Sequence, residues 1–159
     1  LEALESPICK SKMLEVYVYT IEGHALYIDP STRIPKNYNR FIGLMEQLFK
    51  LGRVPPMENK SLMYLKTIKL GDLLGEINVN GLIILSEKCE YKPLPKVIEE
   101  ALSENHAIGI GAFPHGDFEE ETMKHADHCY SIYSEPLTTH IVVSRTLASA
   151  ERFLHIFEV

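Results

Sequence analysis

The sequence predicts an α/β fold with a mainly parallel sheet, because short apolar strands alternate with helical patterns through its second half. The wholly apolar run at residues 82–85 is expected to be a parallel strand covered on both faces, and further strands are expected at residues 107–112 and 129–133. Each is followed by a helical pattern, at residues 95–104, 117–124 and about 137–157. Asp117 should cap the second of these helices. The helix expected at residues 95–104 should direct four side chains toward the protein interior: Val97, Ile98, Ala101 and Leu102.

The first half of the chain predicts a different arrangement. Residues 1–5 indicate the end of a helix that stops at Ser6-Pro7. Residues 13–20 and 24–29 are rich in β-branched and aromatic residues, and the Glu22-Gly23 pair between them predicts a β-hairpin.

The most regular helical pattern begins at residues 32–35 and ends at Gly52, before Pro55-Pro56. Its apolar residues recur at helical spacing and predict a buried stripe of Tyr38, Phe41, Ile42, Met45, Leu48 and Phe49. Residues 53–66 form a polar stretch with an edge strand expected near 62–68, and a short helix is expected over 70–77.

The net charge is −6, from 16 Lys and Arg against 22 Asp and Glu, and such a balance argues against a nucleic-acid partner. The charge is unevenly distributed, however. Residues 1–66 carry nine basic and seven acidic side chains, whereas residues 67–159 carry seven and fifteen. Residues 30–45 contain no acid and three bases, Arg33, Lys36 and Arg40. These predict a cationic spot on a helix face, suited to phosphates, with an ordinary solvated helix face as the alternative.

The cysteine and histidine pattern excludes several classes of site. Cys9, Cys89 and Cys129 are odd in number and far apart, which favours three buried thiols in a reducing cytoplasm over a disulfide framework. His125, His128 and Cys129 have a faint zinc-like spacing without a fourth ligand, so we expect no metal.

No apolar run approaches the about 18 residues of a membrane span, and no G-x-S-x-G nucleophile motif occurs.

Two loops are expected at the carboxyl edge of the parallel sheet, where α/β folds bind ligands. Residues 109–117 contain Gly109 and Gly111, but the dinucleotide fingerprint would need a glycine where Pro114 stands. An adenosine or another phosphate-poor ligand therefore fits better than a pyrophosphate, unless the glycines only shape a tight connection. Residues 130–139 follow the next strand and could bracket a purine beside the glycine loop.

Several of these segments together resemble one family. Residues 4–10 (LESPICK), 29–36 (DPSTRIPK) and 40–45 (RFIGLM) look like blocks of the ribosome-biogenesis pseudouridine N1-methyltransferases. Residues 110–116 (IGAFPHG) and 132–137 (IYSEPL) are similar to that family's cofactor loops. The family is called essential for mitotic growth, or nucleolar essential protein, and belongs to the SPOUT class. The resemblance runs from about residue 4 to the C-terminus, and the chain looks most like the archaeal members.

The resemblance implies a single SPOUT domain over residues 1–159, incomplete at its N-terminus, with a C-terminal trefoil knot. A hairpin and basic-helix extension would occupy residues 13–66, and a cofactor-binding knot region residues 80–159. S-adenosylmethionine would be the cofactor, held by Leu85, Ser86, Gly111, Gly116, Ile132, Tyr133, Ser134, Glu135, Pro136 and Leu137. The RNA-contacting bases of the family fall on Arg33, Lys36 and Arg40, and the family forms homodimers.

The implied activity is methylation at N1 of a pseudouridine in small-subunit ribosomal RNA, with a role in small-subunit biogenesis. The alternative is an RNA-binding ribosome assembly factor without essential catalysis. A nucleotide-binding oxidoreductase is disfavoured by the missing dinucleotide fingerprint. The family's Arg-x-Asp motif falls before residue 1, so no catalytic residue is assigned. The expected location is the cytoplasm, or the nucleolus in a eukaryote.

Overall fold

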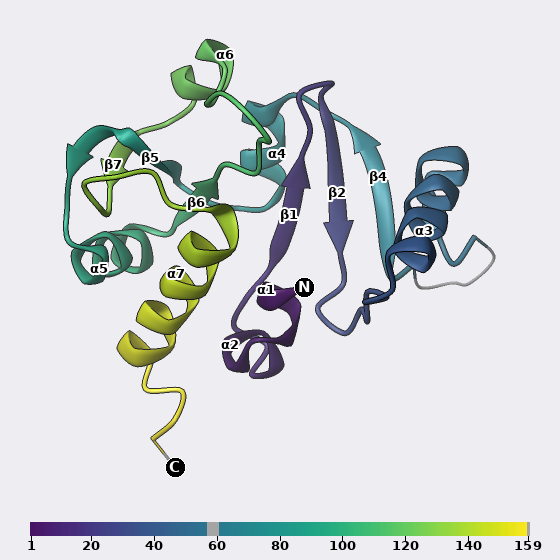
Figure 1. Cartoon of the computed structure of the whole chain (residues 1–159), viewed down its shortest axis with the longest axis horizontal. Coiled ribbons are helices and arrows are strands. Elements are labelled where there is room, and N and C mark those ends of the chain that lie inside the picture. Colours follow the sequence, from purple (N-terminus) through teal and green to yellow (C-terminus); the bar gives the residue numbers. More distant parts are fainter. Residues whose placement is uncertain (57–60, 159) are drawn as a thin grey trace. The chain divides into compact units, whose positions relative to one another are not determined.

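The computed structural model describes residues 1–56 and 61–158 (Figure 1). The chain forms two compact units, which are called unit 1 (Leu1–Lys69) and unit 2 (Leu70–Val159) and are treated separately below. None of the described helices is both long and apolar enough to cross a membrane.

Unit 1 combines short helices with an antiparallel sheet. Its helices are α1 (Glu2–Glu5), α2 (Pro7–Lys10) and α3 (Tyr38–Leu51), and its strands are β1 (Val16–Tyr19), β2 (His24–Ile28), β3 (Arg53–Val54) and β4 (Met63–Thr67). The strand order is β1-β2-β4-β3, with every pair antiparallel. The predicted hairpin is confirmed as β1–β2. The strand predicted near residues 62–68 also exists, but it is not at an edge, because β4 pairs with β2 on one side and β3 on the other.

One of the two helix boundaries predicted near the start of unit 1 needs correction. Helix α1 ends at Glu5 with Ser6 as its C-cap, as predicted, and the Ser6 side chain also accepts a hydrogen bond from the backbone amide of Cys9 and so caps α2. Helix α3 begins at Tyr38 rather than at residues 32–35, since the Asn37 side chain accepts from the amide of Arg40 at 3.1 Å and caps it there. Its end is as predicted, with Gly52 in the left-handed conformation at φ 75°.

Helix α3 lies along the sheet and closes the core of unit 1 (Figure 1). Leu26, Leu48 and Met63 are buried there, with Leu44 and Met45 packed against them. The predicted stripe was too wide, because Tyr38 is 74% and Phe49 50% exposed. At about 100° per residue, these two positions lie roughly 80–100° around the helix from Leu48. Residues 57–60 of the predicted polar stretch lie outside the described residues.

Unit 2 carries the parallel sheet, which confirms the α/β class. Its helices are α4 (Leu70–Glu76), α5 (Leu94–Glu104), α6 (Glu120–Lys124) and α7 (Thr139–Phe153), and its strands are β5 (Gly81–Tyr91), β6 (His106–Ile110) and β7 (His128–Ser131). Strand β5 lies between β6 and β7 and is parallel to both.

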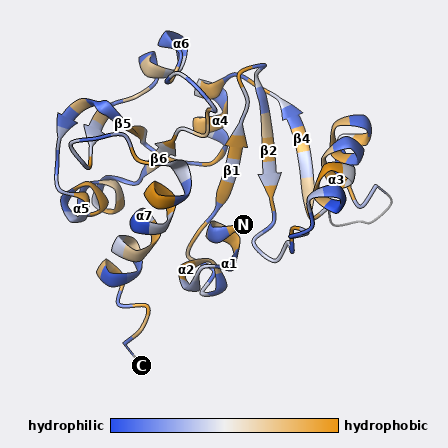
Figure 2. Cartoon of the chain, in the orientation of Figure 1, coloured by the Kyte–Doolittle hydropathy of each residue, from blue (hydrophilic) through white to orange (hydrophobic). Residues whose placement is uncertain are grey.

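The core of unit 2 forms where α5 covers β5. Ile83, Leu85, Val97 and Ala101 are buried together, and α5 also packs on α7. Both helices show apolar and polar residues on different faces (Figure 2). Leu102 is the one predicted inward residue of α5 that the structure contradicts, since it is 42% exposed.

Two helix limits in unit 2 differ from the prediction. Helix α6 begins at Glu120 and Asp117 does not cap it, because the Asp117 carboxylate binds Ser86 and Lys88 instead. Helix α7 ends at Phe153 rather than near residue 157, and His155 beyond it has a left-handed φ of 53°.

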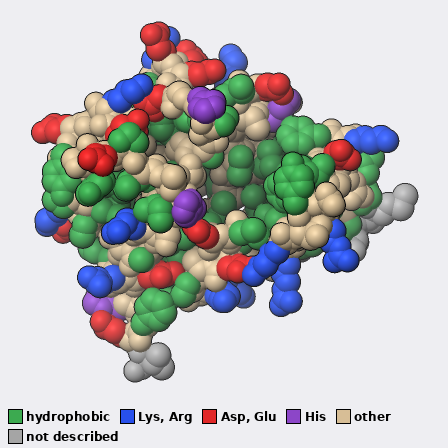
Figure 3. All heavy atoms as spheres, in the orientation of Figure 1, with side chains coloured by type: hydrophobic (Ala, Val, Ile, Leu, Met, Phe, Trp, Pro, Cys, Tyr) green, Lys and Arg blue, Asp and Glu red, His purple; other side chains and the backbone are tan. Residues whose placement is uncertain are grey.

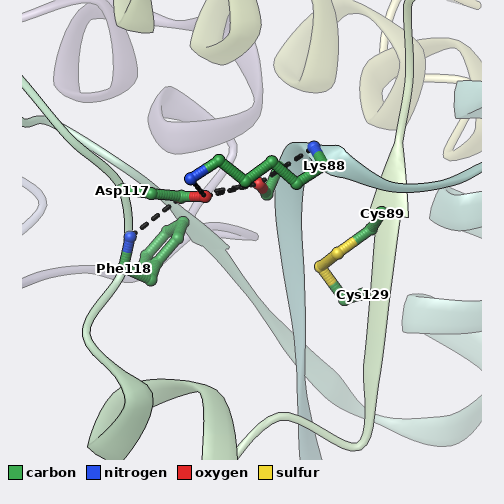
Figure 4. Close-up of a disulfide and its surroundings, with 6 residues drawn as sticks. Lys88, Cys89, Asp117, Phe118 and Cys129 are labelled. Carbon is green, nitrogen blue, oxygen red and sulfur yellow. Dashed lines mark hydrogen bonds and ion pairs between the residues drawn. A yellow bond between two sulfur atoms is a disulfide. The ribbon is translucent and has the colours of Figure 1, made fainter.

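A disulfide joins Cys89 of β5 to Cys129 of β7, contrary to the prediction of three thiols (Figure 4). The two residues are 40 positions apart in the sequence, but the pairing of β5 with β7 brings their Cα atoms to 5.7 Å. Cys9 is a buried thiol as predicted, and burial raises its pKa.

We expect the disulfide to stabilise unit 2 by about 4 kcal/mol, because it closes a loop of 40 residues in the unfolded chain. Chemical denaturation of the wild type and of a Cys89→Ser/Cys129→Ser double variant measures this difference. Adding a reductant should lower the stability of the wild type to that of the variant. The variant, which keeps Cys9, should not respond to the reductant; a response there would contradict the assignment.

Candidate functional site

A cavity of about 200 Å³ opens in unit 2 beside the middle of β5 and beyond the carboxyl ends of β6 and β7. This is the edge of a parallel sheet at which ligands bind in α/β folds. Its volume is below the lower limit of ordinary small-molecule sites, which is roughly 300 Å³. A ligand of ordinary size would therefore fill the cavity and extend through its mouth. Residues 85–87 of β5 line it, together with the segment 110–118 at and after the end of β6, the segment 131–137 at and after the end of β7, and Thr139 and Val142 of α7.

Nine of the ten residues expected to hold the cofactor lie in this lining. They are Leu85, Ser86, Gly111, Gly116, Ile132, Tyr133, Glu135, Pro136 and Leu137. Ser134 is the exception, and it is exposed without lining the cavity. The three lining segments begin about 25 and about 20 residues apart in sequence. The structure brings them together because β5, β6 and β7 are neighbours in one sheet. The binding role of these residues remains a prediction.

Gly111 cannot be replaced without changing the glycine loop. A Cβ atom built there would lie 2.9 Å from the Phe113 ring and 3.4 Å from the Phe118 ring. These two rings pack edge to face, with centroids 5.1 Å apart. The Gly111 carbonyl accepts a hydrogen bond of 2.7 Å from Thr139 Oγ1, which ties the loop to the first turn of α7. Both contacts indicate that the glycine serves the shape of the cavity.

Asp117 is the best-connected charged residue of the lining (Figure 4). Its carboxylate accepts hydrogen bonds from Ser86 Oγ at 3.1 Å and from the Phe118 amide at 2.8 Å, and pairs with Lys88 Nζ at 3.2 Å. Burial raises the pKa of this carboxyl, but the Phe118 amide, Lys88 and Ser86 together outweigh it and hold the pKa below its usual value. Asp117 is therefore an ionised group that fixes the loop after β6 to Ser86 and Lys88 of β5.

The charge of the lining is negative. Glu87, Asp117 and Glu135 contribute three carboxylates, and Lys88, which pairs with Asp117, contributes one ammonium. The balance of two negative charges favours a cationic ligand over a phosphate.

The lining is built for holding a ligand rather than for covalent catalysis. Its Ser86 hydroxyl donates to a carboxylate, and no histidine or cysteine is among the described residues that line the cavity. Sequence reasoning did not assign a role at the site to Asp117 or Thr139, because their partners Ser86 and Gly111 lie in segments far away along the chain. It also gave no signal for Glu87, which lines the cavity.

The three predicted RNA-contacting residues are all exposed in unit 1. On the face shown in Figure 3, Lys and Arg side chains gather below the segment that joins β2 to α3. Lys36 precedes the cap of α3, so the expected stacking of Lys36 and Arg40 on one helix face is wrong. Lys36 instead pairs with Glu5 at 3.0 Å. Within the described part of the chain, no ion pair involves Arg33 or Arg40, which leaves both available to phosphates.

Of the three residues with a zinc-like spacing, His125, His128 and Cys129, the cysteine is bound in the disulfide and offers no thiolate.

Comparison with known proteins gives consistent matches over nearly the whole chain. Residues 1–151 match the family described as EMG1/NEP1 methyltransferase. The chain is 47% identical over 156 residues to the ribosomal RNA small subunit methyltransferase Nep1 of Staphylothermus marinus, covering 98% of this chain and 68% of that protein. It is 44% identical over 135 residues to the protein of the same name from Sulfurisphaera tokodaii, covering 85% and 59%.

A solved structure is also similar, that of Archaeoglobus fulgidus Nep1 bound to S-adenosylhomocysteine. The TM-score is 0.80 at 33% sequence identity, with 96% of this chain and 66% of that chain covered. The chain thus spans about two thirds of the length of these relatives.

We expect Asp117→Asn to destabilise the protein in a pH-dependent way. Because the folded-state pKa is lowered, the ionised carboxylate stabilises the fold above the unfolded pKa of about 4. That contribution is lost as the pH falls through the folded-state value. Melting temperatures measured from pH 7 to pH 2 should therefore differ between wild type and variant near neutrality and converge in acid.

Glu90→Gln, at an exposed carboxylate of β5, is the matched control and should follow the wild type throughout. A gap between wild type and Asp117→Asn that stays constant down to pH 2 would contradict the ionic role of Asp117.

Proposed function

The chain belongs to the EMG1/NEP1 methyltransferase family, and we propose that it takes part in methyl transfer from S-adenosylmethionine to small-subunit ribosomal RNA. The observation that carries this proposal is the convergence of the loops after β6 and β7 with residues 85–87 of β5 on one cavity of the parallel sheet. Relatives that are named small-subunit ribosomal RNA methyltransferases, and a similar structure that holds S-adenosylhomocysteine, support it.

The cavity fits the cofactor on three counts. Its lining has a negative balance that suits the sulfonium cation, and its apolar residues, such as Leu85, Ile110 and Val142, suit an adenine ring. The glycine loop brings backbone close to the ligand at Gly111. When bound, S-adenosylmethionine supplies a methyl group on a good leaving group, so the protein needs mainly to align donor and acceptor.

Several residues of this chain would help to align the methyl donor and its acceptor. The hydrogen bond between Thr139 and Gly111 holds the glycine loop against α7, and Asp117 holds the same loop against Ser86 of β5. Ser131 Oγ donates to the Tyr133 carbonyl at 2.6 Å and shapes the third loop. Glu87 and Glu135 are exposed carboxylates at the cavity and would attract the cation.

We further propose that the acceptor is N1 of a pseudouridine, as the family resemblance implies. The methyl carbon would form a bond to N1 as its bond to sulfur breaks, N1 would lose its proton to solvent, and S-adenosylhomocysteine would leave. The base would be flipped out of its loop to reach the methyl group. No residue of the described chain is assigned as the base for this proton.

The RNA would be held through the exposed bases of unit 1, Arg33, Lys36 and Arg40, whose charges suit its phosphates. The family resemblance also leads us to propose a homodimer, which light scattering would test. The site of action would be where small subunits are assembled, the cytoplasm or, in a eukaryote, the nucleolus.

We expect Gly111→Val to reduce the affinity for S-adenosylmethionine by more than tenfold, because its side chain would displace the Phe113 and Phe118 rings. Isothermal titration calorimetry measures this. Ser134→Ala, in the third loop but outside the lining, is the control and should bind as the wild type does. Failure of the wild-type protein to bind any adenosyl ligand would overturn the proposed cofactor site.

We expect Arg33→Ala and Arg40→Ala each to weaken binding of a pseudouridine-containing ribosomal RNA hairpin, and to reduce the slope of log affinity against log salt by about 1. Fluorescence anisotropy at several salt concentrations measures both. Affinity for S-adenosylmethionine should not change, and Lys50→Ala, near the far end of α3, should leave RNA binding intact.

The same RNA separates methylation from the alternative function, an assembly factor that only binds. Transfer of a labelled methyl group to the hairpin by the full-length protein supports the methyltransferase. Tight RNA binding with no transfer at saturating cofactor would favour the assembly factor.

A further inference from the structure

Three potential metal ligands meet at the amino ends of β6 and β7, on the edge of the sheet away from the cavity. Glu104 is the last residue of α5, His106 the first of β6 and His128 the first of β7. One ligand atom from each lies within 4.8 Å of the others. They converge because β6 and β7 flank β5, with His106 paired to Gly81 and His128 to Ile83.

His106 is held in place with one nitrogen aimed at this cluster. Its side chain is only 9% exposed, and its Nδ1 atom is buried without a hydrogen-bond partner in the described structure. A Cβ atom at Gly81 would lie 2.8 Å from His106 Nε2, so the ring occupies space that only a glycine leaves free. The Nδ1 atom lies 3.6 Å from Glu104 Oε2, too far for a hydrogen bond but directed at a carboxylate.

His128 is positioned by a second group of residues. Its ring stacks on Tyr130, and its Nε2 atom lies 3.4 Å from Glu100 Oε1. Glu100 in turn accepts a hydrogen bond from the Tyr130 hydroxyl at 3.0 Å and pairs with Lys92. Glu100 and Glu104 are one turn apart on α5, so both carboxylates face the two histidines. Such carboxylate support is typical of histidines that bind metals.

We propose that Glu104, His106 and His128 bind a divalent transition metal of the zinc class, a site distinct from the cofactor cavity. Two imidazoles and one carboxylate are ligands suited to Zn²⁺, Co²⁺ or Ni²⁺ rather than to Mg²⁺ or Ca²⁺. This replaces the sequence-based expectation of no metal. The ion would tie the end of α5 to the starts of β6 and β7 and so stabilise unit 2.

The site requires only local movement on loading. Ligands about 2.1 Å from a tetrahedral ion lie roughly 3.4 Å from one another, somewhat closer than the present limit of 4.8 Å. The side chains of Glu104 and His128 are 53% and 41% exposed and can rotate inward, whereas the buried His106 provides the fixed ligand.

Titration calorimetry of the oxidised protein with Zn²⁺ tests the proposal. One ion should bind per chain with a dissociation constant in the micromolar range or tighter, and zinc should raise the melting temperature. Tetrahedral Co²⁺ should give visible absorption bands. Cys89 and Cys129 are in the disulfide and Cys9 is buried, so thiolates do not compete.

Substitutions at the exposed ligands decide the assignment. His128→Asn and Glu104→Gln should each lower zinc affinity at least tenfold without changing the melting temperature of the metal-free protein. Glu100→Gln should weaken binding by roughly tenfold through its effect on His128. His155→Gln is the control, because it removes an exposed histidine that also pairs with a glutamate, Glu158, and should bind zinc normally.

Two results would overturn the proposal. One is the absence of Zn²⁺, Co²⁺ and Ni²⁺ binding by the wild type. The other is unchanged binding in both His128→Asn and Glu104→Gln, which would leave His106 and Glu104 as an ordinary ion pair formed when the imidazole is protonated.

Discussion

The structure of unit 2 depends on the burial of one strand, β5, between two parallel neighbours. Ile83 and Ile84 are fully buried and pair with Ile108 and Gly109 of β6 and with His128 and Cys129 of β7. Because all three strands run in the same direction, the carboxyl ends of β6 and β7 deliver two loops beside residues 85–87 of β5, and their amino ends place His106 and His128 at the other edge, next to Glu104 at the end of α5. The cavity and the histidine cluster are thus two consequences of a single pairing, and the disulfide closes the same pairing at Cys89 and Cys129.

The parts predicted correctly from sequence are those that a local pattern determines. The wholly apolar run at residues 82–85 predicted a strand covered on both faces, and the glycine and Pro136 loops were expected at one sheet edge for that reason. The ten expected cofactor residues came from the family resemblance instead; nine of them line one cavity, and their binding role stays a prediction.

Several errors occur where a residue's partner is distant in sequence. Asp117 had the position of a helix cap, but Ser86 lies 31 residues away and binds its carboxylate instead. Cys89 and Cys129 gave no spacing signal because only the return of the chain along β7 brings them together. His106 and Gly81 are a further example of partners distant in sequence. Gly81 has no side chain and so leaves room for the His106 ring, and only the pairing of β5 with β6 brings the two residues together.

The uneven charge of the sequence acquires a physical meaning from this arrangement. The negative balance of residues 67–159 includes the three carboxylates at the cavity, Glu87, Asp117 and Glu135, only one of which pairs with Lys88. In the proposed reaction the bound sulfonium becomes a neutral thioether when the methyl group leaves. A negative cavity attracts the first species more strongly than the second, because the Coulomb term acts only on the charged form. The same carboxylates that would draw in the donor therefore lose their hold on the product once transfer has occurred, so the electrostatics of the cavity favours exchange of product for fresh cofactor.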